Sequence, residues 1–469
     1  MKKYSTLAIF AAAILVASPM AAQELKTANF LDNYLYGYRI NPSVTPYQTS
    51  GFFGIGASNI GAAVESNFGV STFLFPQSDG TIVTGLNKNV PSSQFPGKME
   101  EINRMHAQVN ENVLSFGFTG SKGHFNTFEI NLVSDNNFQL PRSFFEAFKN
   151  GSESGTYDVK DLALSTSNYL ELALGRSSRK NNLAIGWRIK GLVGVAKASA
   201  NVDMTIVSNS EQMAVRSQGT MEAAAAPITI GQKDGYYDFS NIGINTQSLK
   251  PAGYGAALDL GVSYYLLRDK LVLGAAVRNL GAMKWTTNVY GQTSGTPVII
   301  DVNDTDNLGE KFQDMIKFAP KDAEEASALK MLPMSFNLSA KYKPISLVTL
   351  GAAATINKYD GYLSRDIRLG GAFTPFRQLN IAGSYSFGDQ GQEVGVAASI
   401  RLLGINIYAG IDSFFMKVTP QYIPIDPVST TLNAGLAIAF GKSPAKAASK
   451  KAAKEKKTSK KKSSQEDSE

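Results

Sequence analysis

The feature that most constrains the fold is a strict alternation of apolar residues with small or polar ones, which runs from about residue 49 to residue 441. Within 333–343, for example, Met334, Phe336 and Leu338 alternate with Ser335 and Asn337. Segments 253–266 and 429–441 show the same period of two. Helical spacing does not separate the two kinds of residue in this way, so the pattern predicts strands with one apolar and one small or polar face.

Fourteen such strands can be placed, most of them about 10 to 14 residues long, which is what a tilted transmembrane β-strand needs. We expect them to begin near residues 49, 109, 124, 165, 182, 253, 270, 333, 346, 364, 377, 391, 404 and 429.

The connections between these strands alternate in length. Segments 60–108, 136–164, 197–252 and 282–332 are long, and the turns near 121–123, 177–181, 267–269 and 343–345 are short. Outer-membrane barrels have short periplasmic turns and long external loops, whereas a soluble β-sandwich, the alternative reading, needs no such alternation. The fold class predicted is all-β, a transmembrane antiparallel β-barrel of about 14 strands with both termini periplasmic.

The net charge of +7 resides in the two ends of the chain. Residues 1–22 combine Lys2 and Lys3 with a short apolar stretch, which predicts a secretory signal peptide. Residues 442–469 hold ten Lys against four acidic residues, which predicts a basic, disordered periplasmic tail. The body, 23–441, is nearly neutral and has no basic block, so we expect no nucleic-acid binding. The tail is a candidate for binding a periplasmic polyanion.

Residues 23–48 precede the first strand and are a candidate plug for the barrel formed by 49–441. Two helices are expected in external loops, one at 141–150, opened by Pro141 and followed by Gly151, and one within 308–332.

A family resemblance is carried by the run Tyr254-Gly-Ala-Ala-Leu-Asp-Leu-Gly-Val-Ser-Tyr264, by Leu271-Val-Leu-Gly-Ala-Ala-Val-Arg-Asn-Leu-Gly281 and by Trp285. Asn41-Pro42 and the helix at 141–150 add to it. The chain resembles an uncharacterised Bacteroidota outer-membrane barrel family related to FadL-type fatty-acid transporters and PorV-type secretion barrels. The resemblance implies fourteen strands and an N-terminal segment that enters the lumen. It matches no FadL ligand residue, so it assigns none.

Alternation places eleven charged side chains on the lumen face, as candidates either for ion pairs that fill the lumen or for a polar path. They are Glu129, Glu171, Arg188, Lys190, Asp259, Arg278, Lys341, Arg368, Glu393, Arg401 and Asp412.

Catalysis is not expected, because His106 and His124 are the only histidines and nothing in the sequence places a serine and an acid beside either. With no Cys and two His, we expect neither a metal site nor a cofactor.

Two functions remain open. The first is a FadL-like barrel that passes a small hydrophobic ligand across the outer membrane, with outer-membrane lipid around it. The alternative is a non-transporting subunit or scaffold of an outer-membrane complex for secretion or assembly, with other outer-membrane proteins as partners.

Overall fold

The structure is a computed structural model. It describes residues 24–441 except 33, 47–48, 57, 88, 151–153, 210, 226–227, 245–249, 302–315, 324–328, 360, 390 and 414–428. The predicted signal peptide and the basic tail therefore lie outside the described residues.

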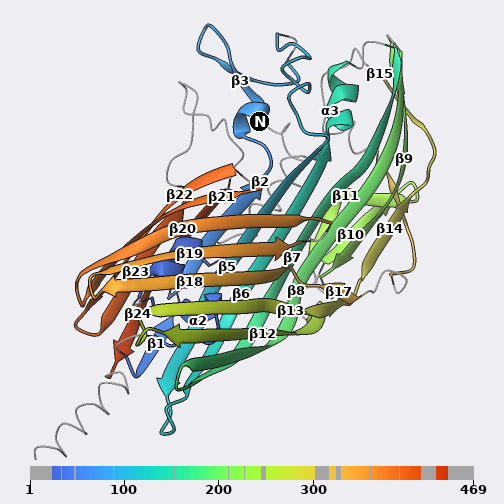
Figure 1. The fold of residues 1–469 in the computed structure, drawn as a ribbon. Helices are drawn as coiled ribbons and strands as arrows, with labels where there is room; N and C mark the ends of the chain where they lie inside the picture. Colours follow the sequence, from blue (N-terminus) through green and yellow to red (C-terminus); the bar gives the residue numbers. More distant parts are fainter. Residues whose placement is uncertain are drawn as a thin grey trace, which may run out of the picture.

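Fourteen antiparallel strands close into a barrel (Figure 1). The first is interrupted: β1 and β2 both pair with β24 on one side and with β5 on the other, and these pairings close the sheet. The barrel strands are β1 (Gly51–Ile55) with β2 (Ile60–Ser66), β5 (Ile102–Thr119), β6 (Phe125–Pro141), β7 (Gly155–Lys180), β8 (Leu183–Ser208), β12 (Gly253–Leu266), β13 (Leu271–Trp285), β18 (Met334–Ile345), β19 (Val348–Lys358), β20 (Leu363–Phe376), β21 (Leu379–Gly388), β22 (Gly391–Leu402), β23 (Ile405–Asp412) and β24 (Ser429–Phe440).

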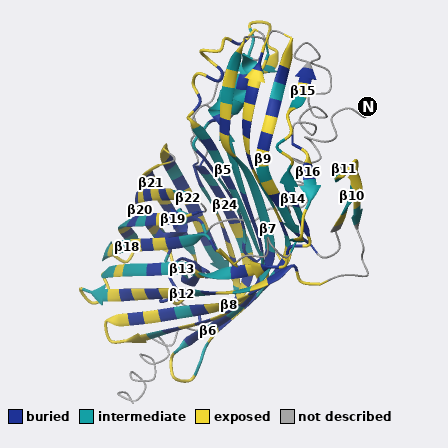
Figure 2. Cartoon of the chain, turned by 90° about the vertical axis from the view of Figure 1, so that its right-hand side faces the viewer, coloured by how far each residue is buried: buried dark blue, intermediate teal, exposed yellow. Residues whose placement is uncertain are grey.

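Exposed and buried residues alternate along these strands (Figure 2), and the exposed ones are mostly apolar while the buried ones are polar or small. On β20, for example, Ile367 is 58% exposed while its neighbour Arg368 is fully buried. On β18, Leu338 is 61% exposed and Asn337 is buried. An outward apolar belt around a closed sheet is what a lipid-embedded barrel requires, because closure leaves no unpaired strand edge in lipid. The chain is an outer-membrane β-barrel.

The two ends of the barrel differ, as the sequence predicts. One end, here called the short-turn end, carries tight connections such as the one between β12 and β13 at residues 267–270. The other, the long-loop end, carries the remaining elements. These are the strands β3 (Leu74–Pro76), β4 (Ile82–Thr84), β9 (Gln212–Ala224), β10 (Ile228–Lys233), β11 (Tyr236–Ile244), β14 (Val289–Thr293), β15 (Val298–Asp301), β16 (Phe318–Pro320) and β17 (Leu329–Met331), and the helices η2 (Val70–Thr72) and α3 (Arg142–Lys149).

The expected strand length of 10 to 14 residues is wrong for one side of the barrel, where β7 and β8 have 26 residues each. A strand of that length spans about 86 Å, more than three times the apolar band of about 25 Å. β8 pairs with β12 through residues 183–194 and with β9 through residues 197–208. Figure 1 shows the upper parts of β7, β8 and β9 rising beyond the barrel, and we call this extension the upper wall.

The upper wall has an apolar core of its own. Val159, Val202, Ile206 and Val215 are buried on one of its faces, and Phe144 and Phe148 of α3 pack against them. The helix predicted at 141–150 is confirmed as α3. The helix expected within 308–332 is wrong where the structure describes it, since Phe318 and Leu329 lie in the short strands β16 and β17. Both pair with neighbouring strands, and this pairing outweighs the helical spacing.

No helix among the described residues is long and apolar enough to cross a membrane.

Candidate functional site

The candidate site is the barrel lumen, which residues 24–44 occupy. This N-terminal segment contains η1 (Lys26–Phe30) and α2 (Gly37–Ile40). Leu25, Phe30, Leu35 and Tyr36 are at most 1% exposed, although the segment belongs to no strand. Its rings pack against rings from the wall, with Tyr36 5.5 Å from Phe52 and Tyr34 4.9 Å from Tyr408 between centroids. The lumen thus contains a packed core.

Glycines of the wall provide the room for this segment. A Cβ at Gly186 of β8 would collide with the Pro42 carbonyl, and one at Gly261 of β12 would collide with Asn41. Gly351 and Gly370 lie against the Phe30 ring in the same way. These lumen-facing glycines are therefore explained by close approach of the N-terminal segment.

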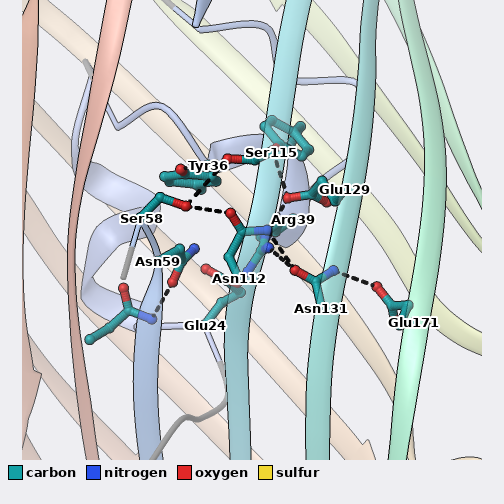
Figure 3. Close-up of polar contacts among 12 residues, drawn as sticks. Glu24, Tyr36, Arg39, Ser58, Asn59, Asn112, Ser115, Glu129, Asn131 and Glu171 are labelled. Carbon is teal, nitrogen blue, oxygen red and sulfur yellow. Dashed lines mark hydrogen bonds and ion pairs between the residues drawn. The ribbon is translucent and has the colours of Figure 1, made fainter. Parts of the chain in front are cut away.

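Arg39 of α2 anchors the segment to the wall. Its Nε lies 2.8 Å from Glu129 Oε1, its Nη1 lies 3.1 Å from Glu24 Oε1, and its Nη2 donates to Asn131 Oδ1 at 2.5 Å. Figure 3 shows Arg39 between these partners, beside the strand β6 that carries Glu129 and Asn131. A guanidinium with two acidic partners in a buried site is held by charge-assisted hydrogen bonds.

The same ion-pair group continues along the wall. Arg188 pairs with Glu129 and, through Nη1, lies 2.9 Å from Asp259 Oδ2. Lys190 Nζ lies 2.9 Å from the same Asp259 oxygen and 3.3 Å from Glu171 Oε2. The strands β6, β7, β8 and β12 supply these residues, so the lumen face of four neighbouring strands forms one network.

A second group lies across the lumen around Arg368 of β20. Arg368 is within 3.1 Å of Asp412, 2.5 Å of Glu393 and 3.5 Å of Asp366. The N-terminal segment joins it, because the Lys26 backbone N–H donates to Asp412 Oδ2 at 2.8 Å and the Thr27 hydroxyl donates to Asp412.

The eleven lumen candidates thus fall into three sets. Glu129, Glu171, Arg188, Lys190 and Asp259 form the first network, and Arg368, Glu393 and Asp412 belong to the second. Three candidates join neither: Arg278 and Lys341 lie along the wall between them, and Arg401 donates to the Ala439 carbonyl at 3.3 Å.

The sequence reasoning missed Glu24, Lys26, Arg39, Glu65 and Asp366. Asp366 was within reach, because it precedes Arg368 by two residues on the same face of a predicted strand. Glu65 lies in β2, which continues the first strand after an interruption. Because of this interruption, the sequence assigns Glu65 to the predicted loop 60–108. Glu24, Lys26 and Arg39 lie in a segment without strand periodicity, and no signal marks them.

Three cavities follow one side of the N-terminal segment. The first, of about 80 Å³, is lined by Arg39, Tyr169, Lys190, Arg278 and Asn357, among others. The second, of about 20 Å³, shares Arg278 and Asn357 with the first. The third, of about 680 Å³, lies at the short-turn end beside Asp32 and Lys343.

The two histidines form no hydrolytic arrangement among the described residues. His106 Nε2 lies 3.0 Å from Asp135 Oδ2, and its ring lies 4.1 Å from that of Tyr359. No Ser or Thr hydroxyl of the described chain hydrogen-bonds to either imidazole. Nor do the described residues include a group of three or more His, Asp or Glu side chains placed to hold a metal ion.

A family model described as "Family of unknown function (DUF5723)" matches residues 42–412. The chain belongs to this family. No curated protein matches it. Similar solved structures include a Pseudomonas aeruginosa FadL homologue, with 11% identity, 90% of this chain and 100% of that chain covered, and a TM-score of 0.45. The toluene transporter TbuX of Ralstonia pickettii is 8% identical, with 87% of this chain and 95% of that chain covered and a TM-score of 0.44. The toluene transporter TodX of Pseudomonas putida is 10% identical, with 89% of this chain and 97% of that chain covered and a TM-score of 0.43. FadL-type barrels are thus among the structures similar to this member of the family, as the sequence resemblance implied, and they assign it no cargo.

Proposed function

We propose that this barrel is a gated path for a small solute across the outer membrane, with residues 24–44 as its gate. One observation carries the proposal: non-covalent contacts such as the Lys26–Asp412 hydrogen bond and the Arg39–Glu129 ion pair hold the segment in the lumen, and a cavity lies directly beside it. Contacts of this kind can be broken and remade without opening the barrel wall. We place the short-turn end and both termini in the periplasm, since short turns are periplasmic in barrels of this type.

The lining of the first cavity bears on the solute. The resemblance implied a small hydrophobic ligand, and Val133 and Tyr169 give the cavity an apolar side. Arg39, Arg188, Lys190 and Arg278 line the rest together with amide side chains. Such a lining favours a solute with a polar or charged group over a pure hydrocarbon, because burying these polar groups against hydrocarbon is costly. No catalytic step is part of this proposal.

Conductance of single barrels in a planar bilayer tests the gate. We expect the full-length protein to be closed for most of the time, and a variant lacking residues 24–44 to conduct steadily. A variant lacking residues 442–469 is the control and should behave like the full-length protein. If the variant without residues 24–44 folds, as shown by heat-modifiable migration in a gel, and still does not conduct, the gate proposal is wrong.

The upper wall favours a second candidate, a subunit or scaffold of an outer-membrane complex. Its paired strands and separate apolar core add a folded surface that a simple pore does not need. Isolation of the protein from its native outer membrane in mild detergent tests this. A stoichiometric partner that is lost when the upper wall is disrupted supports the scaffold, and a lone barrel contradicts it. Binding of the tail to a polyanion stays a prediction.

A further inference from the structure

We propose that the lumen binds small anions, carrying a carboxylate- or phosphate-like group, at two successive cationic positions, Arg278 and Lys341. This inference rests on the proposed gated path and names its solute class. Both residues differ from Arg39, Arg188, Lys190 and Arg368, each of which has an acidic partner within ion-pair distance.

Arg278 of β13 lies at the junction of two cavities, since it lines both the first and the second. Its Nη1 donates to the Arg39 carbonyl at 3.3 Å and its Nη2 donates to Ser335 Oγ at 2.8 Å. Its Nε is buried and has no hydrogen-bond partner, as is also the case for the Nε of Arg188 and of Arg368. No carboxylate of the described residues lies within ion-pair distance of it.

Arg278 differs from the neighbouring arginines in the number of its acidic partners. Arg39 has two acidic partners, and Arg188 and Arg368 have three each. A buried cation without a counter-charge is costly, and an anion from solution would supply both the missing charge and an acceptor for the free N–H. Arg278 therefore has the properties of a receptor rather than those of a structural ion pair.

Lys341 of β18 is the second position, nearer the short-turn end. Its Nζ donates to the Asn29 carbonyl at 2.9 Å, and no described carboxylate pairs with it. Its strand partner is Gly351, against which the Phe30 ring is packed. Lys341 lines none of the three cavities itself and borders the second through Asn29, which lines it.

The order of these features follows one face of one strand. Ser335, Asn337, Ser339, Lys341 and Lys343 point successively into the lumen along β18. Ser335 lines the first cavity, Asn337 the second and Lys343 the third. From Ser335 to Lys343 the strand rises about 27 Å, close to the thickness of the apolar band. The first two cavities are therefore adjoining chambers that share Arg278, and the third is a separate chamber at the short-turn end.

The acidic residues that line the first two cavities each have a cationic partner. Glu24 pairs with Arg39 at 3.1 Å, Glu171 pairs with Lys190 at 3.3 Å and Asp366 pairs with Arg368 at 3.5 Å. The charge that remains without a partner in the first two chambers is positive. An unpaired cation at this position attracts an anion locally.

The test measures binding separately from passage. Full-length protein in neutral detergent is titrated calorimetrically with inorganic phosphate at low ionic strength, with glycerol as the uncharged comparison. We expect saturable phosphate binding, weakened about tenfold or more by Arg278→Gln and reduced by Lys341→Gln. Arg278→Lys, which keeps the charge, should retain most of the binding. Arg401→Gln is the matched control, since the acceptor for Arg401, the Ala439 carbonyl, lines none of the three cavities, whereas Asn29, the acceptor for Lys341, lines the second.

Unchanged phosphate affinity in a folded Arg278→Gln protein, or no binding to the wild type, would overturn the anion site. Reversal potentials across a KCl gradient provide the second readout. They are measured during the open events of single barrels of the full-length protein. Wild type should prefer anions, and Arg278→Gln with Lys341→Gln should lose that preference. Binding without any conductance would keep the anion site and reject the gate. Conductance with no binding and no ion preference would keep the gate and reject the anion site.

Discussion

Single residues decide whether the N-terminal segment stays in the lumen. Gly186 is the sharpest case, because the Pro42 carbonyl occupies the space of its missing Cβ, whereas Gly191 on the same strand has open space there. We expect Gly186→Val to displace the segment and Gly191→Val to leave it in place. Protease cleavage within residues 24–44 measures this. Equal protection in both variants would show that the close approach at Gly186 does not hold the segment.

Arg39 contributes the electrostatic part of the same anchorage. Arg39→Ala leaves Glu24 without its ion-pair partner and removes one of the partners of Glu129. Breaking a buried ion pair from one side costs about 3–5 kcal/mol. We expect spontaneous opening events in bilayer recordings while heat-modifiable migration of the barrel is kept. The comparison is Arg179→Ala, which removes an exposed pair with Asp269 and should change neither. An Arg39→Ala protein as closed as the wild type would contradict this account.

At the scale of elements, the upper wall should unfold independently of the barrel. Ile206 is fully buried in the wall core, whereas its neighbour Val207 is 51% exposed on the opposite face. A buried aspartate without a partner is strongly destabilising, so we expect Ile206→Asp to make the upper part of β8 exchange amide hydrogens rapidly. Val207→Asp should not do so, and strands β18–β24 should stay protected in both. Loss of protection throughout the barrel in Ile206→Asp would mean that wall and barrel form one cooperative unit.

The elements also show how far sequence reasoning reaches. Strands such as β18 could be predicted because lipid on one side and a packed lumen on the other enforce the period of two. The extension of β7 was not predicted because a β-bulge lies between Val159 and Leu162, where two residues of β7 stand opposite Asp203 of β8. This bulge adds a residue to β7 and reverses the alternation there, so the pattern of its lower part does not continue into the extension. β2 was not predicted, because the first strand is interrupted between Ile55 and Ile60, where Gly56 has a φ of 59°.

The residues of the site likewise divide into those that the sequence predicts and those that it does not. The strand face of Glu129, Arg188 and Asp259 follows from alternation, but their partners in the N-terminal segment do not. Arg39 lies in a four-residue helix that is set by its fit to the lumen rather than by any local periodicity. Contacts between such a segment and a wall hundreds of residues away are decided by tertiary packing, which a single sequence does not display.

At the scale of the whole molecule, the central claim is that a closed barrel opens only when its N-terminal segment moves. The chain has no cysteine, so an engineered pair is unambiguous. Thr27 Oγ1 and Ser384 Oγ lie 2.6 Å apart, joining the segment to β21 within reach of a disulfide. The most direct measurement is the single-barrel conductance of Thr27→Cys with Ser384→Cys, oxidised and then reduced, with Thr27→Cys alone as control. We predict that oxidation abolishes opening and that reduction restores it. An oxidised barrel that opens as often as the reduced one would contradict the claim.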